Sequence, residues 1–348
     1  MRLLFQRFEG LRSLPFVELA ELPTPVQRVE HVSAAADAEV WCKRDDLTAS
    51  LYGGNKVRKL EWILGEARGR SCDSLITVGA TGSHHILATA VYGARHGFDV
   101  HAALFPQPWN EHVEENVRAV LAAGATLHLA TSYAGMAWRV LAVARGLRRQ
   151  GKRPHIVGPG GSSPVGAIGY VEAGLEVAAQ IEEGVLPEPS AVFVAAGSGG
   201  TVVGASIGLA AAGITCPVVG VRVTDRIAIN RPLLAILARR TVDHLRRFDD
   251  RFPAVADMAL RNIEIDSGQI GRGYGVETEA GQRATALAAQ DGLTLDPTYT
   301  SKALAGLIAR AAGRRALFWL TLSGADMAPL LEQADPAPDW VRAHAAKA

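Results

Sequence analysis

The chain alternates short runs rich in β-branched and aromatic residues with longer segments rich in alanine and leucine, and this alternation limits the folds open to it. The strand-like runs are EVWCK (39–43), SLITVG (74–79), DVHAALF (99–105), ATLHLA (125–130), HIVG (155–158), AVFVA (191–195), PVVGVRV (217–223) and ALFWLTL (316–322). Strands that alternate with helices form βαβ units and parallel sheets. We therefore predict an open parallel-sheet α/β fold, and 348 residues accommodate about two domains.

Composition excludes several classes of partner. Lysine and arginine number 36 and aspartate and glutamate 35, so the net charge of +1 gives no general attraction for nucleic acid or anionic membranes. Cys42, Cys72 and Cys216 lack the CxxC spacing of a zinc site, and the scattered histidines lack ligand spacing, so no metal is expected. Charged residues interrupt the first 25 residues, and no stretch approaches the ~20 apolar residues of a membrane helix. We expect a cytoplasmic protein with a small-molecule substrate.

The segment GGNKVRKLE (53–61) places a lysine at the expected start of a helix. Apolar residues then recur with the spacing of one buried helical face, at Val57, Leu60, Ile63, Leu64 and Ala67. Asn55 is the expected N-cap and Lys56 the first helical residue. Partial positive charge at a helix N-terminus, together with Arg58 and Lys59, favours the neutral amine of Lys56, which is the form that makes a Schiff base. From this stretch alone, an exposed lysine in a basic first turn is the alternative.

A glycine-rich turn follows the run AVFVA. The sequence AVFVAAGSGGTVVG reads as strand, turn and helix, and GSGGT (197–201) offers converging amides and a hydroxyl to an anion such as phosphate. The turn lacks the Gly-Lys-Ser/Thr ending of a P-loop. Val202 stands where a dinucleotide motif has its third glycine, although Asp225 could mimic a ribose-binding acid. A phosphate site, a dinucleotide site and a merely tight turn all remain open here.

Two basic stretches, RGLRRQGKRP (145–154) and ARRTVDHLRRFDDRF (238–252), could bind anions. Solvated helix faces or helix ends are the favoured interpretation, because charge runs usually mark such surfaces. We assign neither stretch a function.

A candidate Schiff-base lysine and a single-phosphate turn in one α/β chain together indicate pyridoxal 5′-phosphate, whose aldehyde and phosphate need those two groups. At this point the sequence resembles the 1-aminocyclopropane-1-carboxylate deaminase and D-cysteine desulfhydrase family. The resemblance rests on KRDDLTASLYGGNKVRKLE (43–61), GGSSPVGAIGY (160–170), AAGSGGT (195–201) and DPTYTSKALAGL (296–307). These segments occur in the same order between about Pro23 and Thr321.

The resemblance implies the two-domain fold type II of pyridoxal phosphate enzymes, also called tryptophan synthase β-like. Residues 1–50 and 168–348 would form the large cofactor-binding domain, and residues 51–167 the small domain. The cofactor would lie in the cleft between them, and the protein would be a homodimer.

The family's functional residues map onto this sequence by the same resemblance. Lys56 would hold the cofactor and act as the base at the substrate Cα. The phosphate would be held by Gly197, Ser198, Gly199, Gly200 and Thr201. The further catalytic residues would be Ser83, Tyr274 and Tyr299, and the substrate would bind around Asn55, Thr81, Gly82, Ser83 and His85. Thr321 or Ser323 would lie at the pyridine nitrogen.

Three positions depart from the family pattern. His84 replaces an asparagine that bonds the 3′-oxygen of the cofactor, so a cofactor-adjacent role is expected for it with altered hydrogen bonding. Thr300 stands where ring-opening deaminases carry a glutamate facing the pyridine ring, and a neutral hydroxyl cannot keep that nitrogen protonated as a carboxylate does. The family's HTGG appears as LTLSGAD (320–326). The weaker electron sink favours elimination over opening of a cyclopropane.

We therefore expect a pyridoxal-phosphate-dependent lyase or deaminase acting on a small amino acid, with β-elimination from D-cysteine to give pyruvate and ammonia as the leading reaction. A 1-aminocyclopropane-1-carboxylate deaminase or an amino-acid racemase is the alternative within the family. An NAD-dependent oxidoreductase using the 197–204 turn, and a non-catalytic ligand-binding protein that kept the fold, are the alternatives outside it.

Overall fold

The computed structural model describes residues 2–132, 135–332 and 334–345, which form two compact units. Unit 1 comprises Met1–Leu14, Leu19–Lys59 and Ser162–Ala325, and unit 2 comprises Pro15–Glu18, Leu60–Gly161 and Asp326–Ala348. Helix α3 (Asn55–Gly69) begins in unit 1 and ends in unit 2. The C-terminal segment, expected in the large domain, groups with unit 2 because Val341 packs against Val113 and Val117 there.

Unit 1 is a layered α/β structure around a sheet in the order β1-β2-β10-β7-β8-β9. Its strands are β1 (Val26–Arg28), β2 (Glu39–Arg44), β7 (Ala191–Ala196), β8 (Val218–Arg222), β9 (Ile263–Asp266) and β10 (Arg315–Leu320). Its helices are α1 (Leu3–Arg7), η1 (Glu9–Ser13), α2 (Glu30–Ala36), η2 (Asp45–Leu47), α7 (Pro164–Glu182), α8 (Gly200–Ala211), α9 (Arg231–Phe248), α10 (Ala256–Asn262), α11 (Glu279–Gln290) and α12 (Thr300–Arg310). The described strands pair in parallel except β1 with β2, which confirms the predicted fold class.

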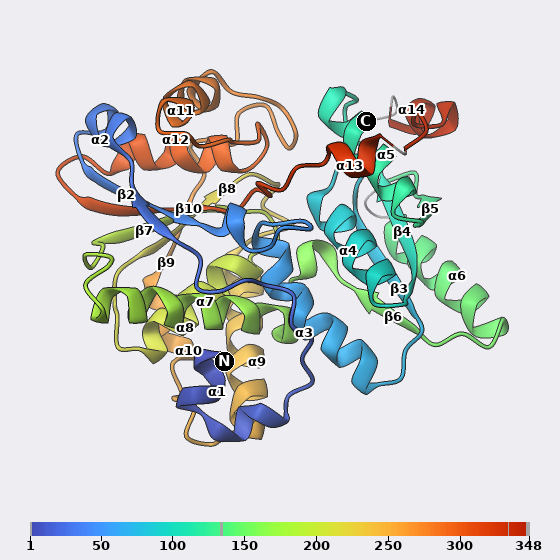
Figure 1. Cartoon of the computed structure of the whole chain (residues 1–348), viewed down its shortest axis with the longest axis horizontal. Helices are drawn as coiled ribbons and strands as arrows, with labels where there is room; N and C mark the ends of the chain where they lie inside the picture. The colour runs from blue at the N-terminus through green and yellow to red at the C-terminus, as the bar shows by residue number, and fades with distance from the viewer. Residues whose placement is uncertain (1, 133–134, 333, 346–348) are drawn as a thin grey trace. The chain divides into compact units, whose positions relative to one another are not determined.

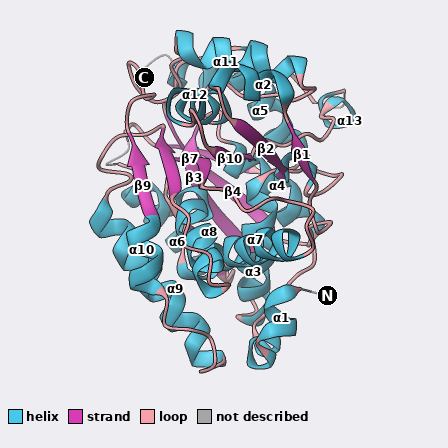
Figure 2. Cartoon of the chain, turned by 90° about the vertical axis from the view of Figure 1, so that its left-hand side faces the viewer, coloured by secondary structure: helices cyan, strands magenta, loops and turns pink. Residues whose placement is uncertain are grey.

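The core of unit 1 follows from the two-residue period of its strands. Alternate residues of β7, Ala191, Phe193 and Ala195, are buried in one cluster with Leu304 and Leu307 of α12. Helices α2, α11 and α12 lie on this side of the sheet, and α7, α8 and α10 lie on the other (Figures 1 and 2). Both faces of the central strands are therefore covered, as expected for parallel strands that are apolar throughout.

Helices α7 and α8 pack unusually close because glycines line their contact. A Cβ on Gly204 would lie 2.4 Å from the carbonyl oxygen of Ala167, and one on Gly208 would lie 2.2 Å from that of Val171. Side chains at these two positions would force the helices apart. The close packing fixes the first turn of α8, which follows the GSGGT turn.

Unit 2 is built on a parallel sheet in the order β5-β4-β3-β6. Its elements are β3 (Ser74–Ala80), α4 (His84–Arg95), β4 (Asp99–Phe105), α5 (Glu111–Ala122), β5 (Thr126–Leu129), α6 (Met136–Arg149), β6 (Pro154–Val157), η3 (Pro159–Gly161), α13 (Ala328–Leu331) and α14 (Asp339–Ala345). Ile76 and Val78 of β3 pack against Met136 of α6, whereas Leu75 points to Gly93 of α4. The two helices therefore cover opposite faces of the sheet (Figure 1). No helix of the described residues combines the length and apolarity needed to cross a membrane.

Candidate active site

Lys56 lies in the first turn of α3, as predicted, although the helix begins at Asn55 rather than after it. Its Nζ donates to Oδ1 of Asn55 at 2.6 Å. Asn55 is itself held by its backbone N–H, which donates to the carbonyl of Thr321, and by Nδ2, which donates to Oγ1 of Thr201. Burial lowers the pKa of Lys56 to about 8, although the carboxylate of Asp296 opposes this shift. A substantial fraction of this amine is neutral near physiological pH.

The GSGGT turn joins the carboxyl end of β7 to the amino end of α8, as predicted. Gly199 has φ of +87°, a conformation that favours glycine. Oγ of Ser162 accepts from the N–H of Gly200 at 3.0 Å and lies 2.7 Å from Oγ of Ser198. A Cβ on Gly200 would lie only 2.5 Å from that Ser162 oxygen, so the turn tolerates no side chain there. The hydroxyls and amides therefore gather at the positive end of a 12-residue helix.

A buried lysine lies at the same helix end. Lys59 is 2% exposed, and its Nζ would lie 3.1 Å from a Cβ on Gly200. Burial lowers the pKa of Lys59 well below its usual value, and the neighbouring Lys56 lowers it further. A bound anion would favour the charged form of Lys59, which burial and Lys56 disfavour. The donor set of this corner of unit 1 thus suits a phosphate group.

Tyr274 and Tyr299, two of the expected catalytic residues, lie next to each other. Their hydroxyl oxygens lie 2.6 Å apart and their rings meet edge-on. The Tyr299 ring lies 6.0 Å from Nζ of Lys56 and 3.5 Å from a Cβ on Gly197, so it adjoins both the lysine and the glycine turn. Burial raises the pKa of Tyr274 to about 12 and that of Tyr299 well above its usual value, with Asp296 adding to both. Both phenols are protonated at neutral pH.

Thr321 and Ser323 follow β10 and face the loop before α3. Oγ of Ser323 accepts from the N–H of Gly53 at 2.8 Å and from that of Ala325 at 3.3 Å. The Thr321 carbonyl accepts from Asn55, and the side-chain hydroxyl of Thr321 makes no hydrogen bond with the rest of the described chain. Ser323 accepts in both of its bonds, so each of the two hydroxyls keeps a hydrogen to donate.

The Thr300 hydroxyl is bonded within its own turn. It donates to Oδ2 of Asp296 at 2.7 Å and accepts from the N–H of Asp296 at 2.8 Å. The Asp296 carboxylate also accepts from the backbone N–H groups of Thr298, Tyr299 and Thr300. Asp296 therefore caps the start of α12 and sets the backbone of Tyr299.

The predicted substrate-binding residues 81–85 belong to unit 2 and run from the end of β3 into the first turn of α4. Thr81 donates its hydroxyl to the carbonyl of Phe105 at 3.0 Å, and the N–H of Gly82 donates to Oε1 of Gln107 at 3.2 Å. Ser83 precedes α4 with extended backbone, and His85 is buried in the first turn of the helix. Two donors of the expected substrate-binding residues thus have partners inside unit 2.

His84 is paired with a second histidine that the sequence did not single out. Its Nε2 lies 3.1 Å from Nε2 of His112 on α5. The side-chain Nδ2 of Asn116 lies 3.3 Å from the same His112 nitrogen and donates to the carbonyl of Gly82. The two histidines and Asn116 therefore form one polar cluster beside the Gly82 backbone.

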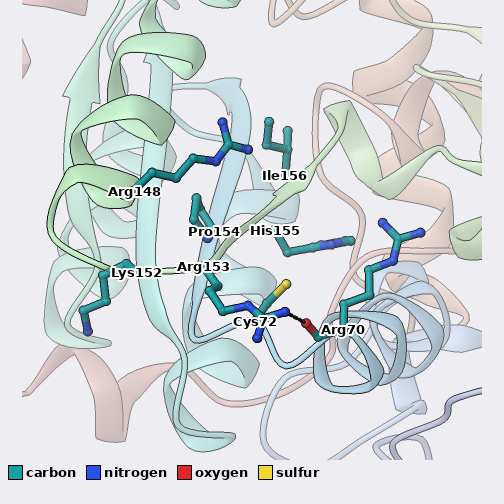
Figure 3. Close-up of a pocket in the computed structure, with 8 residues that line it drawn as sticks. All are labelled: Arg70, Cys72, Arg148, Lys152, Arg153, Pro154, His155 and Ile156. Carbon is teal, nitrogen blue, oxygen red and sulfur yellow. Dashed lines mark hydrogen bonds between the residues drawn. The ribbon is translucent and has the colours of Figure 1, made fainter.

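The basic stretch 145–154 lines a hollow of about 540 Å³ in unit 2 (Figure 3). Its lining residues are Arg70, Cys72, Arg148, Lys152, Arg153, Pro154, His155 and Ile156. Arg153 donates to the carbonyl of Arg70, while the side chains of Arg148 and Lys152 point apart. The hollow lies at the amino ends of β3 and β6, whereas open α/β sheets bind ligands beyond the carboxyl ends of their strands. Cations at the end of α6 suit the negative end of that helix, in line with the favoured interpretation.

Sequence reasoning missed several residues of these clusters. They are Lys59, His112, Ser162, Asp296 and Lys302. Ser162 lies in GGSSPVGAIGY (160–170), a segment that carries the family resemblance but to which no role is assigned. Asp225, the candidate ribose-binding acid, is exposed after β8, and the neighbouring Thr224 instead donates to the carbonyl of Gly197.

The sequence matches a family model described as pyridoxal-phosphate dependent enzyme over residues 17–317. The D-cysteine desulfhydrases of Salmonella paratyphi B and Salmonella newport are each 35% identical over 304 residues, which is 86% of this chain and 89% of theirs. These matches span most of both units.

Solved structures give the same picture of the fold. A crystal structure of an ACC deaminase homologue is 31% identical, with a TM-score of 0.77, and the match covers 93% of this chain and 98% of that one. A fungal L-serine ammonia-lyase from Rhizomucor miehei is 15% identical with a TM-score of 0.60, over 91% and 98% of the two chains, and supports the fold alone.

Proposed function

This chain belongs to the family of pyridoxal-phosphate-dependent enzymes, and from that premise we propose that it is a lyase that eliminates a leaving group from Cβ of a small D-amino acid, with D-cysteine as the leading substrate. The relatives at 35% identity are named D-cysteine desulfhydrases, which supports this substrate. The enzyme is pyridoxal-phosphate dependent, and its activity is of the lyase or deaminase type.

The observation that carries the proposal is the combination of Lys56, the glycine turn and the tyrosine pair within unit 1. An amine whose pKa is lowered to about 8 can react with an aldehyde, and the amides and Lys59 at the start of α8 suit a phosphate. The Tyr299 ring adjoins both groups. Pyridoxal phosphate carries an aldehyde and a phosphate, so its two functional groups match these two sites.

The residues that would hold the cofactor follow from this geometry. Lys56 would bind its aldehyde, and residues 197–201 with Lys59 would hold its phosphate. Thr321 or Ser323 would donate to the pyridine nitrogen, because accepting two backbone N–H groups leaves the Ser323 hydroxyl hydrogen unused. When bound, the cofactor supplies an electron-withdrawing ring that stabilises negative charge at the substrate Cα.

The protein side chains would then move protons. Lys56 would remove the Cα proton. Tyr299 and Tyr274 are protonated at neutral pH and serve as donors, because burial and Asp296 raise the pKa of both phenols. Ser83 and the turn around it are assigned to the substrate. The Cβ–S bond of D-cysteine breaks, and the addition of water gives pyruvate, ammonia and hydrogen sulfide.

Thr300 favours this reaction over ring opening. In the ring-opening deaminases that the sequence resembles, a glutamate at this position faces the pyridine ring. Here the Thr300 hydroxyl donates to the Asp296 carboxylate and accepts from the backbone N–H of Asp296. Without that glutamate the cofactor ring is a weaker electron sink. Loss of a thiolate, which is a good leaving group, demands less of the ring than cleavage of a carbon–carbon bond.

The test compares the wild type with Lys56→Ala and with Lys152→Ala, an exposed lysine outside the candidate site. Hydrogen sulfide and pyruvate are measured with D-cysteine, L-cysteine and 1-aminocyclopropane-1-carboxylate. We expect D-cysteine turnover by the wild type and by Lys152→Ala, and a loss of about 100- to 10,000-fold or more in Lys56→Ala. Turnover retained by Lys56→Ala would refute the assignment.

The same assay in heavy water separates elimination from racemisation. A racemase would return deuterium to Cα without releasing ammonia, whereas a lyase releases ammonia in step with substrate loss. Deuterated substrate without ammonia would replace the proposed function with racemisation.

We further propose that the protein is a cytoplasmic homodimer. The free cysteines Cys42, Cys72 and Cys216 support a reducing compartment. Light scattering coupled to gel filtration tests the dimer, for which twice the chain mass of 36.8 kDa is expected. A single-chain mass across the accessible concentration range would contradict it.

A further inference from the structure

Tyr274 is part of a segment that has little regular secondary structure. It lies between β9 and α11, in residues 267–278. Gly271, Gly273 and Gly275 in this segment have φ of 63°, 143° and 75°. Backbone of this kind needs an external support to keep a single conformation.

The support comes from α12, the helix that also carries Tyr299 at its start. Lys302, in the first turn of α12, donates from Nζ to the carbonyl of Ile270 at 2.9 Å and to that of Gly273 at 3.2 Å. Gly273 immediately precedes Tyr274 in the chain. The Lys302 side chain is fully buried. A buried lysine that donates to two carbonyls of one turn fixes that turn, because losing the donor would leave two partly buried acceptors without this partner.

Asp296, just before α12, fixes the backbone of the other tyrosine. Oδ1 of Asp296 accepts from the N–H of Tyr299 at 2.7 Å. The start of α12 therefore positions both phenols: Asp296 fixes the backbone of Tyr299, and Lys302 fixes the segment of Tyr274. Their hydroxyls meet at 2.6 Å, a separation that a shift of either segment by about 1 Å would destroy.

We propose that Lys302 is a positioning residue, which holds the 267–278 segment so that the Tyr274 hydroxyl meets that of Tyr299. This rests on the proposed function for its effect on turnover, since the tyrosine pair is the proton donor there. The charged and titratable groups around the pair are Asp296, Lys56 and Lys302 itself. Lys302 donates to carbonyls of the segment, so it acts through the backbone of that segment.

The experiment combines kinetics with hydrogen exchange on the holoenzyme. The variants are Lys302→Met, Tyr274→Phe, the double variant and, as a matched control, Arg310→Met in the last turn of the same helix. Arg310 pairs with Glu264 on β9, outside the tyrosine segment. We expect Lys302→Met to lower kcat by about 10- to 100-fold, because a displaced donor loses its alignment. In the Tyr274→Phe background, Lys302→Met should lower kcat by less than about twofold.

Hydrogen exchange gives a readout that does not need turnover. Amides of residues 267–278 should exchange faster in Lys302→Met than in the wild type. In Arg310→Met they should exchange at the wild-type rate. If Lys302→Met fails to fold, Gly273→Ala disturbs the same turn from its other side, since alanine disfavours φ of 143° and meets no neighbour there. It should reproduce both effects.

Fully additive losses in the double variant, or unchanged exchange in residues 267–278, would overturn the proposal. A wild type that turns over no amino acid would instead refute the proposed function, while the exchange measurement would still decide whether Lys302 holds the segment.

Discussion

At the scale of single residues, the environment of Lys56 makes an ordinary lysine reactive. Burial disfavours its charged form, and the Asn55 oxygen holds the amine in the first turn of α3. The Asp296 carboxylate works in the opposite direction, which keeps the pKa near 8 rather than lower. The amine is therefore neutral often enough to react and basic enough to accept a proton afterwards.

This pKa predicts how the rate of cofactor attachment depends on pH. At pH 7, an amine of pKa about 8 is about one-tenth neutral, whereas an ordinary lysine of pKa about 10.5 is neutral in about one molecule in 3,000. The rate at which cofactor-free protein takes up pyridoxal phosphate should rise with pH and level off above about 8. Stopped-flow absorbance measures it, and a rate still rising tenfold per pH unit at 9 would contradict the assigned pKa.

Single-residue predictions from the sequence succeeded where a local pattern carried the information. The position of Lys56 at a helix start and the strand, turn and helix at GSGGT follow from neighbours within a few residues. Lys59, Ser162 and Lys302 could not be assigned in the same way. Each acts through a side-chain contact with a segment about 30 to 140 residues away, and nothing local in the sequence encodes such a contact.

At the scale of elements, the turn between β7 and α8 combines an unusual backbone with tight surroundings. Gly199 has φ of +87°, and a Cβ there would lie 2.6 Å from Cδ2 of Leu234. Gly213, just beyond the other end of α8, has φ of +83° but nothing within 4 Å of its Cβ position. An alanine at Gly213 would therefore strain the backbone alone, whereas one at Gly199 would strain the backbone and also collide with Leu234.

We predict that Gly199→Ala and Gly213→Ala both destabilise the protein by about 1–2 kcal/mol, because alanine disfavours positive φ. Only Gly199→Ala should also weaken pyridoxal phosphate binding, by displacing the turn against Leu234. Thermal unfolding and cofactor titration measure the two effects. Equal cofactor affinity in both variants would argue that the turn does not hold the phosphate.

The predicted strand-like runs all correspond to strands of the structure, whereas β1 and β9 were not predicted. Strand β1 has three residues, VQR, with no buried side chain, and β9 is the half-exposed sequence IEID at the edge of its sheet. Short edge strands lack the apolar run that marks a central parallel strand. Pairing with β2 and β8, rather than local sequence, makes them strands.

At the scale of the whole molecule, a cluster of buried charges joins the segments of unit 1 that carry Lys56. Arg58 of α3 donates to Asp45 of η2 and to Glu176 of α7, and Lys43 of β2 donates to Glu176. Tyr170 donates to Asp45. Although burial opposes it, Arg58 and Lys43 lower the pKa of Glu176 to about 2.

Breaking this cluster should destabilise the protein more than breaking a surface pair. Arg58→Met leaves Asp45 buried without its cation and Glu176 paired with Lys43 alone, which costs about 3–5 kcal/mol. Arg239→Met, which removes an exposed pair with Asp257, should cost about 0–1 kcal/mol. The stabilisation by ionised Glu176 is present above its unfolded pKa of about 4.5 and is lost as the pH falls toward 2. Urea unfolding measures these changes, and equal effects of the two variants would contradict this role.

The most direct test of the central claim is the visible absorption spectrum of the purified protein with pyridoxal 5′-phosphate, recorded before and after D-cysteine is added. We predict a Schiff-base band that requires Lys56, that D-cysteine changes, and whose change accompanies hydrogen sulfide release. A protein that shows no such band, or the same band in Lys56→Ala, would contradict the assignment of Lys56 and with it the proposed mechanism.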